Sequence, residues 1–254
     1  MSGPVKRIGI GIAGAPETVI QSANRVSGEF ESVCYCSQGI VDKSSAVKGV
    51  HVSEHANPGQ ALVDDLMAGR IDAAVRGTLP ANATLKALKW AAGVAHLERI
   101  ALLETVRGKK FLLAPVGVDE GWTVADKLEL IKKGRIIAQK FGLPEKIGIL
   151  SGGRLGDIGR HPQVDASMAD AELLARLCDA THCEILIEDA VETCGLIIAP
   201  DGISGNLIFR TLVFLGGGTG HGAPVVNISR IFVDSSRALP DYANALLLAA
   251  SLLE

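Results

Sequence analysis

Three short polar segments carry residue types that can bind an anion, and each stands where a predicted strand ends or a helix begins. Ser151-Gly152-Gly153-Arg154 follows the apolar run at 146–150, Asn206 opens a helix after the predicted strand at 194–199, and Ser229-Arg230 ends a later strand. Glycines expose backbone N–H groups, and arginine offers a fork of donors to phosphate or carboxylate. These types predict a small-anion site. The alternatives are an ordinary loop with a solvated arginine and, for Asn206, a place beside a helix cap.

A glycine-rich segment precedes Ser229-Arg230. Five of the seven residues from 216 to 222 are glycine, and His221 stands among them. Ordering such a segment costs much conformational entropy, so it is expected to form a loop that approaches a ligand closely or moves. His221 is therefore a candidate acid or base, and polar lining is the alternative.

A different glycine motif lies near the start of the chain. Gly9-Ile10-Gly11-Ile12-Ala13-Gly14 matches G-x-G-x-x-G between a predicted strand and a helix. Such glycines let a backbone approach a pyrophosphate. The acidic residue expected after the second strand is missing, because Cys34-Tyr35-Cys36 stands there. We therefore favour a close-packed turn over a site for a dinucleotide or S-adenosylmethionine.

Composition argues against several classes of protein. The chain is 48% hydrophobic but only 4% aromatic, so its core must consist of aliphatic residues, as in buried parallel strands flanked by helices. A net charge of −3 without a Lys/Arg-rich tract makes nucleic acid an unexpected partner. No apolar run reaches about 18 residues, so no membrane span is expected. Five cysteines without ligand spacing or a secretion signal predict reduced thiols, no metal site and a cytoplasmic protein.

Strand and helix patterns alternate along the chain and predict an α/β fold with a mostly parallel sheet. Up to residue 90 the order is β-α-β-β-α-β-α, and two long strands at 96–106 and 109–116 then form a predicted hairpin. The later expected elements are a helix at 122–141, a strand at 146–150, a helix at 169–178, strands at 183–187 and 194–199, a helix at 204–214, a strand at 223–228 and a helix at 240–253.

The order of motifs resembles that of the phosphate acetyl/butyryl transferase (phosphotransacetylase) superfamily. The matching segments, in the family's order, are Leu150-Ser151, His161-Pro162-Gln163-Val164-Asp165, Pro200-Asp201 with Gly205-Asn206, Leu215-Gly216-Gly217, Pro224-Val225 and Ser229-Arg230. Weaker similarity runs back to Asp72. Within the superfamily, the short chain resembles a methanogen branch named putative methyltransferase subunit X, or methanogenesis marker protein 4.

This resemblance implies a two-lobed α/β/α layered fold, like that of isocitrate and isopropylmalate dehydrogenases. One lobe would comprise residues 1–90 and 226–254, the other residues 91–225, with a ligand cleft between them. Such proteins are typically homodimers, and the apolar helix at 207–215 would need cover.

The resemblance also implies roles for single residues. In phosphotransacetylases a Ser-Arg pair stabilises developing charge, and a later Asp acts as base for the thiol of coenzyme A. Ser229 and Arg230 match the pair here. The base would be Asp241, if about five residues are inserted before it, and Asp234 is the rival.

The chain departs from the family's pattern around the second cation. The family's arginine before the second lobe falls near Lys86, which lacks the bidentate fork. Arg76, which ends a predicted strand, is expected to compensate, with Thr78 in the turn after it. The expected ligand-binding set is therefore Arg76, Thr78, Ser151, Gly152, Gly153, Arg154, Asn206 and His221.

Two classes of function follow from the resemblance. The first is a transferase acting on a phosphate- or thiol-bearing small molecule such as coenzyme A, coenzyme M or a methyl carrier; a phosphate acyltransferase using coenzyme A is one form of it. The second is a non-catalytic subunit or regulator of a methyltransferase that binds such an anion. The sequence names neither the substrate nor a protein partner.

Overall fold

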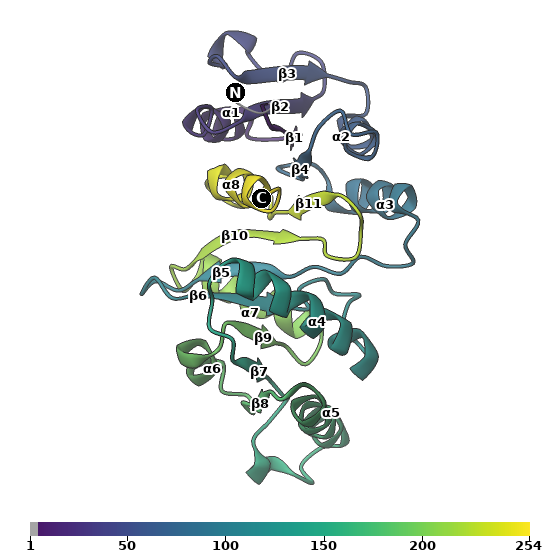
Figure 1. Cartoon of the computed structure of the whole chain (residues 1–254), viewed down its shortest axis with the longest axis vertical. Coiled ribbons are helices and arrows are strands. Elements are labelled where there is room, and N and C mark those ends of the chain that lie inside the picture. The colour runs from purple at the N-terminus through teal and green to yellow at the C-terminus, as the bar shows by residue number, and fades with distance from the viewer. Residues whose placement is uncertain (1–4) are drawn as a thin grey trace. The chain divides into compact units, whose positions relative to one another are not determined.

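The computed structural model describes residues 5–254 and divides into two compact units. Unit 1 extends to Leu97 and resumes from His221 to Glu254, and unit 2 runs from Glu98 to Gly220. The sequence prediction set the two boundaries at 90/91 and 225/226. Each unit is an α/β structure built on its own set of parallel strands (Figure 1).

Unit 1 contains a sheet in the order β3-β2-β1-β4-β11-β10. Its first five strands in that order are parallel, and β10 pairs antiparallel with β11. The strands are β1 (Arg7–Ile12), β2 (Glu31–Cys36), β3 (Val50–Glu54), β4 (Ala73–Val75), β10 (Thr219–Pro224), which crosses the unit boundary, and β11 (Ile231–Asp234).

Four α-helices accompany this sheet: α1 (Pro16–Arg25), α2 (Pro58–Met67), α3 (Ala81–Ala92) and α8 (Ala243–Ser251). Helices α2 and α3 pack against each other, and α8 packs on α1, β1, β4 and β11. Phe232 of β11 packs in the cluster that includes α2 and α3 side chains. The next residue, Val233, lies on the side of α8, because a Cβ placed on Gly222 would be close to both Val233 and Leu248 of α8. Because successive strand residues point to opposite faces, the two helix pairs cover opposite faces of the sheet.

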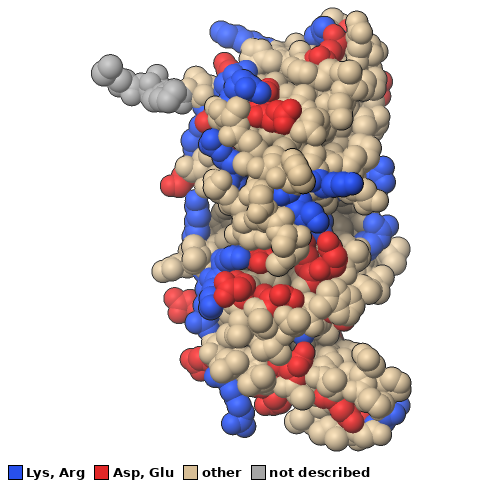
Figure 2. Space-filling view, turned by 90° about the vertical axis from the view of Figure 1, so that its right-hand side faces the viewer, with Lys and Arg blue, Asp and Glu red and all other residues tan. Residues whose placement is uncertain are grey.

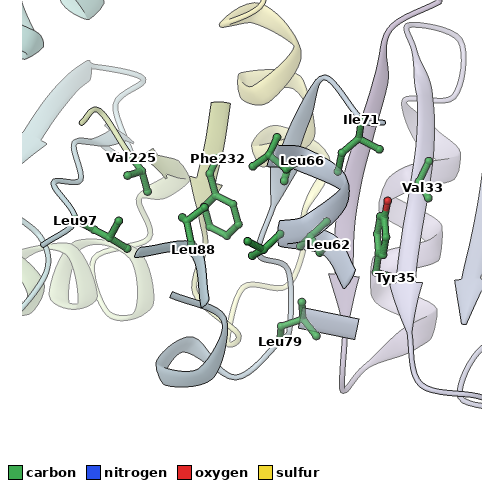
Figure 3. Packing of buried hydrophobic residues seen from close by; sticks show 12 residues of the cluster. Val33, Tyr35, Leu62, Leu66, Ile71, Leu79, Leu88, Leu97, Val225 and Phe232 are labelled. Carbon is green, nitrogen blue, oxygen red and sulfur yellow. The ribbon is translucent and has the colours of Figure 1, made fainter. Parts of the chain in front are cut away.

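The unit 1 core contains branched aliphatic side chains and few aromatic ones. Leu62 and Leu66 of α2 lie beside Phe232 of β11 and Tyr35 of β2, and all four are almost fully buried (Figure 3). Burying each such side chain contributes about 1.5–3 kcal/mol. The Tyr35 hydroxyl donates to Asp65 at 2.5 Å, so its one polar atom is satisfied at the edge of this core.

Unit 2 contains a sheet in the order β5-β6-β9-β7-β8, parallel except for the antiparallel β5–β6 hairpin. Its strands are β5 (Ala101–Glu104), β6 (Lys110–Ala114), β7 (Ile147–Ile149), β8 (Thr181–His182) and β9 (Leu196–Ile198). Its α-helices are α4 (Val124–Lys140), α5 (Pro162–Cys178), α6 (Ile187–Thr193) and α7 (Gly202–Phe214). Two short 3-10 turns complete the chain, Lys43–Ser45 in unit 1 and Leu155–Asp157 in unit 2.

Side-chain caps explain where several helices begin. Thr123 accepts from Asp126 N while the Asp126 carboxylate accepts from Thr123 N, a capping box at the start of α4. Asn57 caps α2 as the sequence predicts, and Asp201 caps α7. The cap of α7 is therefore Asp201 and not Ser204, and the helix begins two residues earlier than expected.

Three segments differ from the sequence prediction. The apolar run at 183–187, predicted as a strand, ends in helix α6, and the strand is the two-residue β8 just before it. Helix α5 begins at Pro162, two turns before the predicted start. The glycine-rich segment predicted as a loop enters β10 at Thr219, and the strand that follows is β11, which the sequence analysis missed. Within residues 5–254, no helix combines the length and apolar character that crossing a bilayer requires.

Candidate functional site

The carboxyl ends of parallel strands β6, β9 and β7 meet at one edge of the unit 2 sheet. Ser151 follows β7, Asn206 lies in the first turns of α7 after β9, and Val116 follows β6. The Asn206 amide donates to the Val116 carbonyl at 2.9 Å. The structure therefore brings Asn206 to the predicted edge, where the amide also fixes the loop after β6.

That loop is held tightly against the start of α7. A Cβ on Gly202 would lie 1.6 Å from the Gly117 carbonyl oxygen, and one on Gly205 would lie 1.9 Å from that of Pro115. Glu120 is buried and pairs with Arg99 at 2.6 Å, and it accepts from Gly117 N at 3.1 Å. Burial raises the pKa of Glu120, while the adjacent Arg99 guanidinium opposes the shift. This part of the edge is rigid scaffold.

The loop 151–154 is the more open part of the same edge. Ser151 is only 1% exposed, while Gly152 and Arg154 are exposed. Gly152 N donates to the Ser167 hydroxyl at 2.9 Å, and Arg154 N donates to Asp157 at 2.9 Å. The backbone is therefore anchored on both sides, while Arg154 is exposed and its charge is near enough to help lower the pKa of Asp157.

His182, which the sequence analysis did not select, contacts Ser151, and Glu172, also not selected, contacts His182. The His182 Nε2 atom lies 2.8 Å from the Ser151 hydroxyl, and its Nδ1 atom lies 2.8 Å from Glu172 Oε1. His182 is in β8, beside β7, and Glu172 is on α5. The sequence shows no short spacing that links these three residues, so only the fold brings them together.

In unit 1, Arg76 lies at the carboxyl edge as predicted, but its donors are engaged within the protein. Its side chain is 6% exposed and pairs with Asp234, while Nη1 donates to the Leu79 carbonyl at 2.7 Å and Nη2 donates to the Ser235 carbonyl. These contacts join the loops after β4 and β11. They give Arg76 a structural role, because most of its guanidinium N–H donors already have acceptors within the protein.

Thr78 is also occupied. Its hydroxyl accepts from Ala13 N at 2.9 Å and from Gly14 N at 3.2 Å, and the residue is 5% exposed. Thr78 thereby shapes the turn between β1 and α1. Within β1, a Cβ on Gly11 would lie 1.9 Å from Leu79 Cδ1, so this glycine serves close packing.

The structure corrects the position expected for Ser229 and Arg230. They do not end a strand at the edge that holds Arg76; they lie in the loop before β11, at the amino ends of β11 and β4. The Arg230 guanidinium donates to the Met67 carbonyl at 3.2 Å and lies near Gly69. It therefore caps the carboxyl end of α2. The error arose because β11 was not recognised.

A second Ser-Arg pair occupies the place that the first was expected to fill. Ser236-Arg237 follows β11 at the carboxyl edge, and Arg237 is exposed. Asp241 comes four residues after Arg237, so no insertion is needed between this pair and the predicted base. The repeated Ser-Arg dipeptide was the available signal, and the apolar run 231–233 before Ser236 indicated a strand.

Neither candidate base has a free carboxylate. Asp241 Oδ1 pairs with Arg25 at 2.5 Å and accepts from the Ser22 hydroxyl at 2.9 Å and from Ala243 N at 2.8 Å. Although partial burial opposes it, these hydrogen bonds and the Arg25 charge lower the pKa of Asp241, which weakens it as a base. Asp234, the rival, is 9% exposed and paired with Arg76.

His221 lies inside β10 and is half-buried, so it is not in the expected mobile loop. The glycines beside it serve packing: a Cβ on Gly222, whose φ is +123°, would lie 2.5 Å from Val233 Cγ1. Close contact with Val233 of the neighbouring strand β11, together with the positive φ, explains the glycine at this position. The expectation that Gly216–Gly222 forms a flexible wall is wrong from Thr219 onward.

The five cysteines are free thiols, and burial raises the pKa of Cys34 to about 12 and that of Cys183 to about 11. Among the described residues, no group of three or more His, Cys, Asp or Glu side chains is arranged to hold a metal ion. On the face shown in Figure 2, basic and acidic side chains are interspersed. The described residues of that face therefore form no extended field of one sign.

Proteins from methanogens are similar to this chain over nearly its whole length. A Methanosarcina mazei protein named "Putative methyltransferase mtx subunit X" is 43% identical over 253 residues, 97% of this chain and 90% of that protein. A Methanosarcina barkeri protein of the same name is 47% identical over 208 residues, 80% of this chain and 77% of that protein. A Methanopyrus kandleri protein named as an uncharacterized methyltransferase is 37% identical, covering 97% and 98%. No protein-family model matches the chain.

Solved structures with the same fold are phosphotransacylases. A branched-chain phosphotransacylase from Enterococcus faecalis matches with a TM-score of 0.74 and 17% identity, covering 98% of this chain and all of that one. A phosphotransacetylase from Staphylococcus aureus matches with a TM-score of 0.65 and 13% identity, covering 98% and 94%. The predicted phosphotransacetylase-like α/β fold is confirmed, and at these identities the likeness concerns the fold alone.

Proposed function

The chain belongs to the family of proteins named "Putative methyltransferase mtx subunit X", and we propose that it binds a phosphate- or thiol-bearing small-molecule anion in methyl-group transfer. The observation that carries the proposal is the exposed Arg154 in the loop after β7. This loop begins with Ser151 at the carboxyl end of a parallel strand, where open α/β sheets bind ligands. Arginine at such a position suits a phosphate or a carboxylate.

Within unit 1, Ser236 and Arg237 take the place expected for Ser229 and Arg230. They follow a parallel strand at its carboxyl end, whereas Ser229 and Arg230 lie at the opposite edge of the same sheet. The proposed anion contacts lie in unit 2, in the loop 151–154. A bound anion would accept from the Arg154 guanidinium, because the Gly152 N–H already donates to Ser167.

Catalysis and binding alone make different demands on the carboxylates. A phosphate acyltransferase that uses coenzyme A needs a carboxylate able to take the thiol proton. Asp241 and Asp234 are both held in ion pairs, which favours the second candidate, a ligand-binding subunit or regulator of a methyltransferase. The relatives' name, subunit X, supports a protein that works with other methyltransferase subunits.

Self-association through α7 is a further part of the proposal. Leu207 on this helix is 60% exposed, and Leu215, directly after it, is 84% exposed. A cavity of about 640 Å³ runs between α7, α6 and the β5–β6 hairpin. Covering this apolar surface with a second copy would stabilise a homodimer. Light scattering should give twice the 26.5 kDa of one chain, and Leu207→Glu should give the single-chain mass. A monomer for the unaltered protein contradicts this part.

A thermal-shift screen tests the proposed ligand class. The protein would be heated with coenzyme A, acyl phosphates, coenzyme M and methyl-carrier analogues in turn. A ligand present at a hundred times its Kd stabilises the folded state by about 2.7 kcal/mol. This stabilisation raises the unfolding temperature by a readily measured amount. Arg154→Ala should reduce the shift, and Arg230→Ala should retain it. Equal shifts in both variants would show that Arg154 takes no part in binding.

A further inference from the structure

The contacts around Ser151 require one proton more than Ser151, a neutral His182 and an ionised Glu172 hold together. The Ser151 hydroxyl lies 3.0 Å from the Gly153 carbonyl, which can only accept, and 2.8 Å from His182 Nε2. A serine hydroxyl has one proton to donate. It can therefore donate to Gly153 or to His182, but not to both.

The other nitrogen of His182 adds a second condition. Nδ1 lies 2.8 Å from Glu172 Oε1, so a proton must lie between these two atoms. If neutral His182 holds its proton on Nδ1, Nε2 is an acceptor and Ser151 must donate to it, which leaves the Gly153 carbonyl without this donor. All three contacts exist together only when the His182–Glu172 pair holds one proton more.

We propose that Ser151, His182 and Glu172 form a hydrogen-bond relay that makes the loop 151–154 respond to protons. With the extra proton, Ser151 donates to Gly153 and fixes the loop. Without it, the hydroxyl turns to His182 and the Gly153 carbonyl is released. His182 and Glu172 are positioning residues here, because they act on the loop through Ser151.

Burial and access to solvent suit such a relay. Ser151 is 1% exposed and the His182 side chain 7%, so their hydrogen bonds are shielded from competing water. The Glu172 side chain is 48% exposed and gives protons a path from solvent. His182 and Glu172 also line a cavity of about 340 Å³. Glu172 and His182 can therefore exchange protons with solvent, although Ser151 itself is almost inaccessible to solvent.

The other titratable groups around His182 come from three further segments. Lys146 precedes β7, Cys183 and Glu184 follow β8, and Asp189 is on α6; all line the same cavity. Cys183 stays a thiol near neutral pH, because burial raises its pKa to about 11. Glu184 is tied to the loop itself, since its carboxylate accepts from Leu155 N at 3.1 Å. Of this set, histidine is the residue type that ordinarily changes charge between pH 5 and 8.

The relay predicts that anion binding takes up a proton, and this consequence rests on the anion site proposed above. The extra proton brings positive charge next to the loop and keeps the Gly153 carbonyl turned toward Ser151. Both effects favour an anion. Sulfate is the suitable probe, because its own charge does not change in the range used. Its affinity should fall by roughly three- to tenfold between pH 6 and pH 8.5.

Two measurements test the proposed relay. Calorimetric sulfate titrations at the two pH values would compare the unaltered protein with His182→Gln and with His51→Gln, a matched change at an exposed histidine of unit 1. The pH dependence should disappear in His182→Gln and persist in His51→Gln. Equal pH dependence in all three proteins would overturn the relay.

The second measurement needs neither a variant nor sulfate. Nitrogen NMR of the histidine rings should show the neutral His182 ring protonated on Nδ1 at pH 8.5, facing Glu172. A proton on Nε2 instead would overturn the relay even if sulfate binds. Absence of sulfate binding at either pH, with the expected ring proton, would instead overturn the anion site and leave the relay supported.

Discussion

The carboxyl edges of the two sheets carry similar residue types but differ in what those side chains contact. In unit 1, Arg76 and Thr78 are buried and bonded to neighbouring loops. In unit 2, Arg154 is exposed while the backbone that carries it is anchored. A polar residue at a strand end therefore indicates a ligand site only when the fold leaves its donors accessible. Otherwise it stabilises the loops around it.

Replacing Arg76 should give the largest effect, and it should be on stability. Arg76→Met leaves Asp234 buried without its main partner, and removing one member of a buried pair costs about 3–5 kcal/mol. Urea unfolding followed by circular dichroism measures the loss. Arg25→Met is the matched control, because its pair with Asp241 is more exposed and contributes less than about 1 kcal/mol. Similar losses in the two variants would remove the distinction between buried and exposed pairs.

Replacing Arg154 should affect binding and leave stability nearly unchanged. Hydrogen bonds to charged groups contribute about 1.5–3 kcal/mol, so Arg154→Ala should weaken sulfate binding about ten- to a hundredfold. Arg160→Ala removes the same charge from the same segment, where Arg160 pairs with Asp157 at 2.6 Å. A comparable loss in Arg160→Ala would mean that general charge, and not the Arg154 fork, attracts the anion.

The fold was largely predictable because local patterns decide most of its elements. Apolar runs such as 8–12 become buried strands, and Asn57 caps α2 as its position suggests. The errors fall where tertiary contacts override local pattern. The run 183–187 is apolar enough for a strand but supplies the start of α6. Gly222, in a segment whose glycines indicate a loop, instead lets β10 pass close to the Val233 side chain of β11.

The site was less predictable because a residue's type does not show which partners the fold provides. Sequence order placed Ser151, Arg154 and Asn206 at one sheet edge, since each adjoins a parallel strand. It could not show that Arg76 is engaged by Asp234, 158 residues away, or that His182 meets Ser151. The choice between two Ser-Arg pairs depended on recognising one four-residue strand, β11.

Arg230→Ala tests that choice directly. Because Arg230 donates to the Met67 carbonyl at the end of α2, the variant should lose about 0.5–1.5 kcal/mol of unfolding free energy, the contribution of one hydrogen bond. Ligand shifts in the thermal screen should be unchanged. Loss of ligand binding with normal stability would return Arg230 to the site and contradict its structural role.

Asp241 should show the smallest effect, and its sign depends on pH. Its folded-state pKa is lower than its ordinary value of about 3.9, so its charge adds stability above about pH 4, and that contribution is lost as pH falls through the folded-state pKa. An asparagine side-chain oxygen also accepts hydrogen bonds, so Asp241→Asn removes the charge and keeps an acceptor for Ala243 N. The Asp241 side chain is 38% exposed, so solvent screens its pair with Arg25, and the variant should lose less than about 1 kcal/mol at pH 7. In urea unfolding, the difference should shrink as the pH is lowered from 7 through the folded-state pKa. A difference that stays the same over this pH range would mean that Asp241 contributes through its shape and not through its charge. The argument that its ion pair weakens it as a base would then fail.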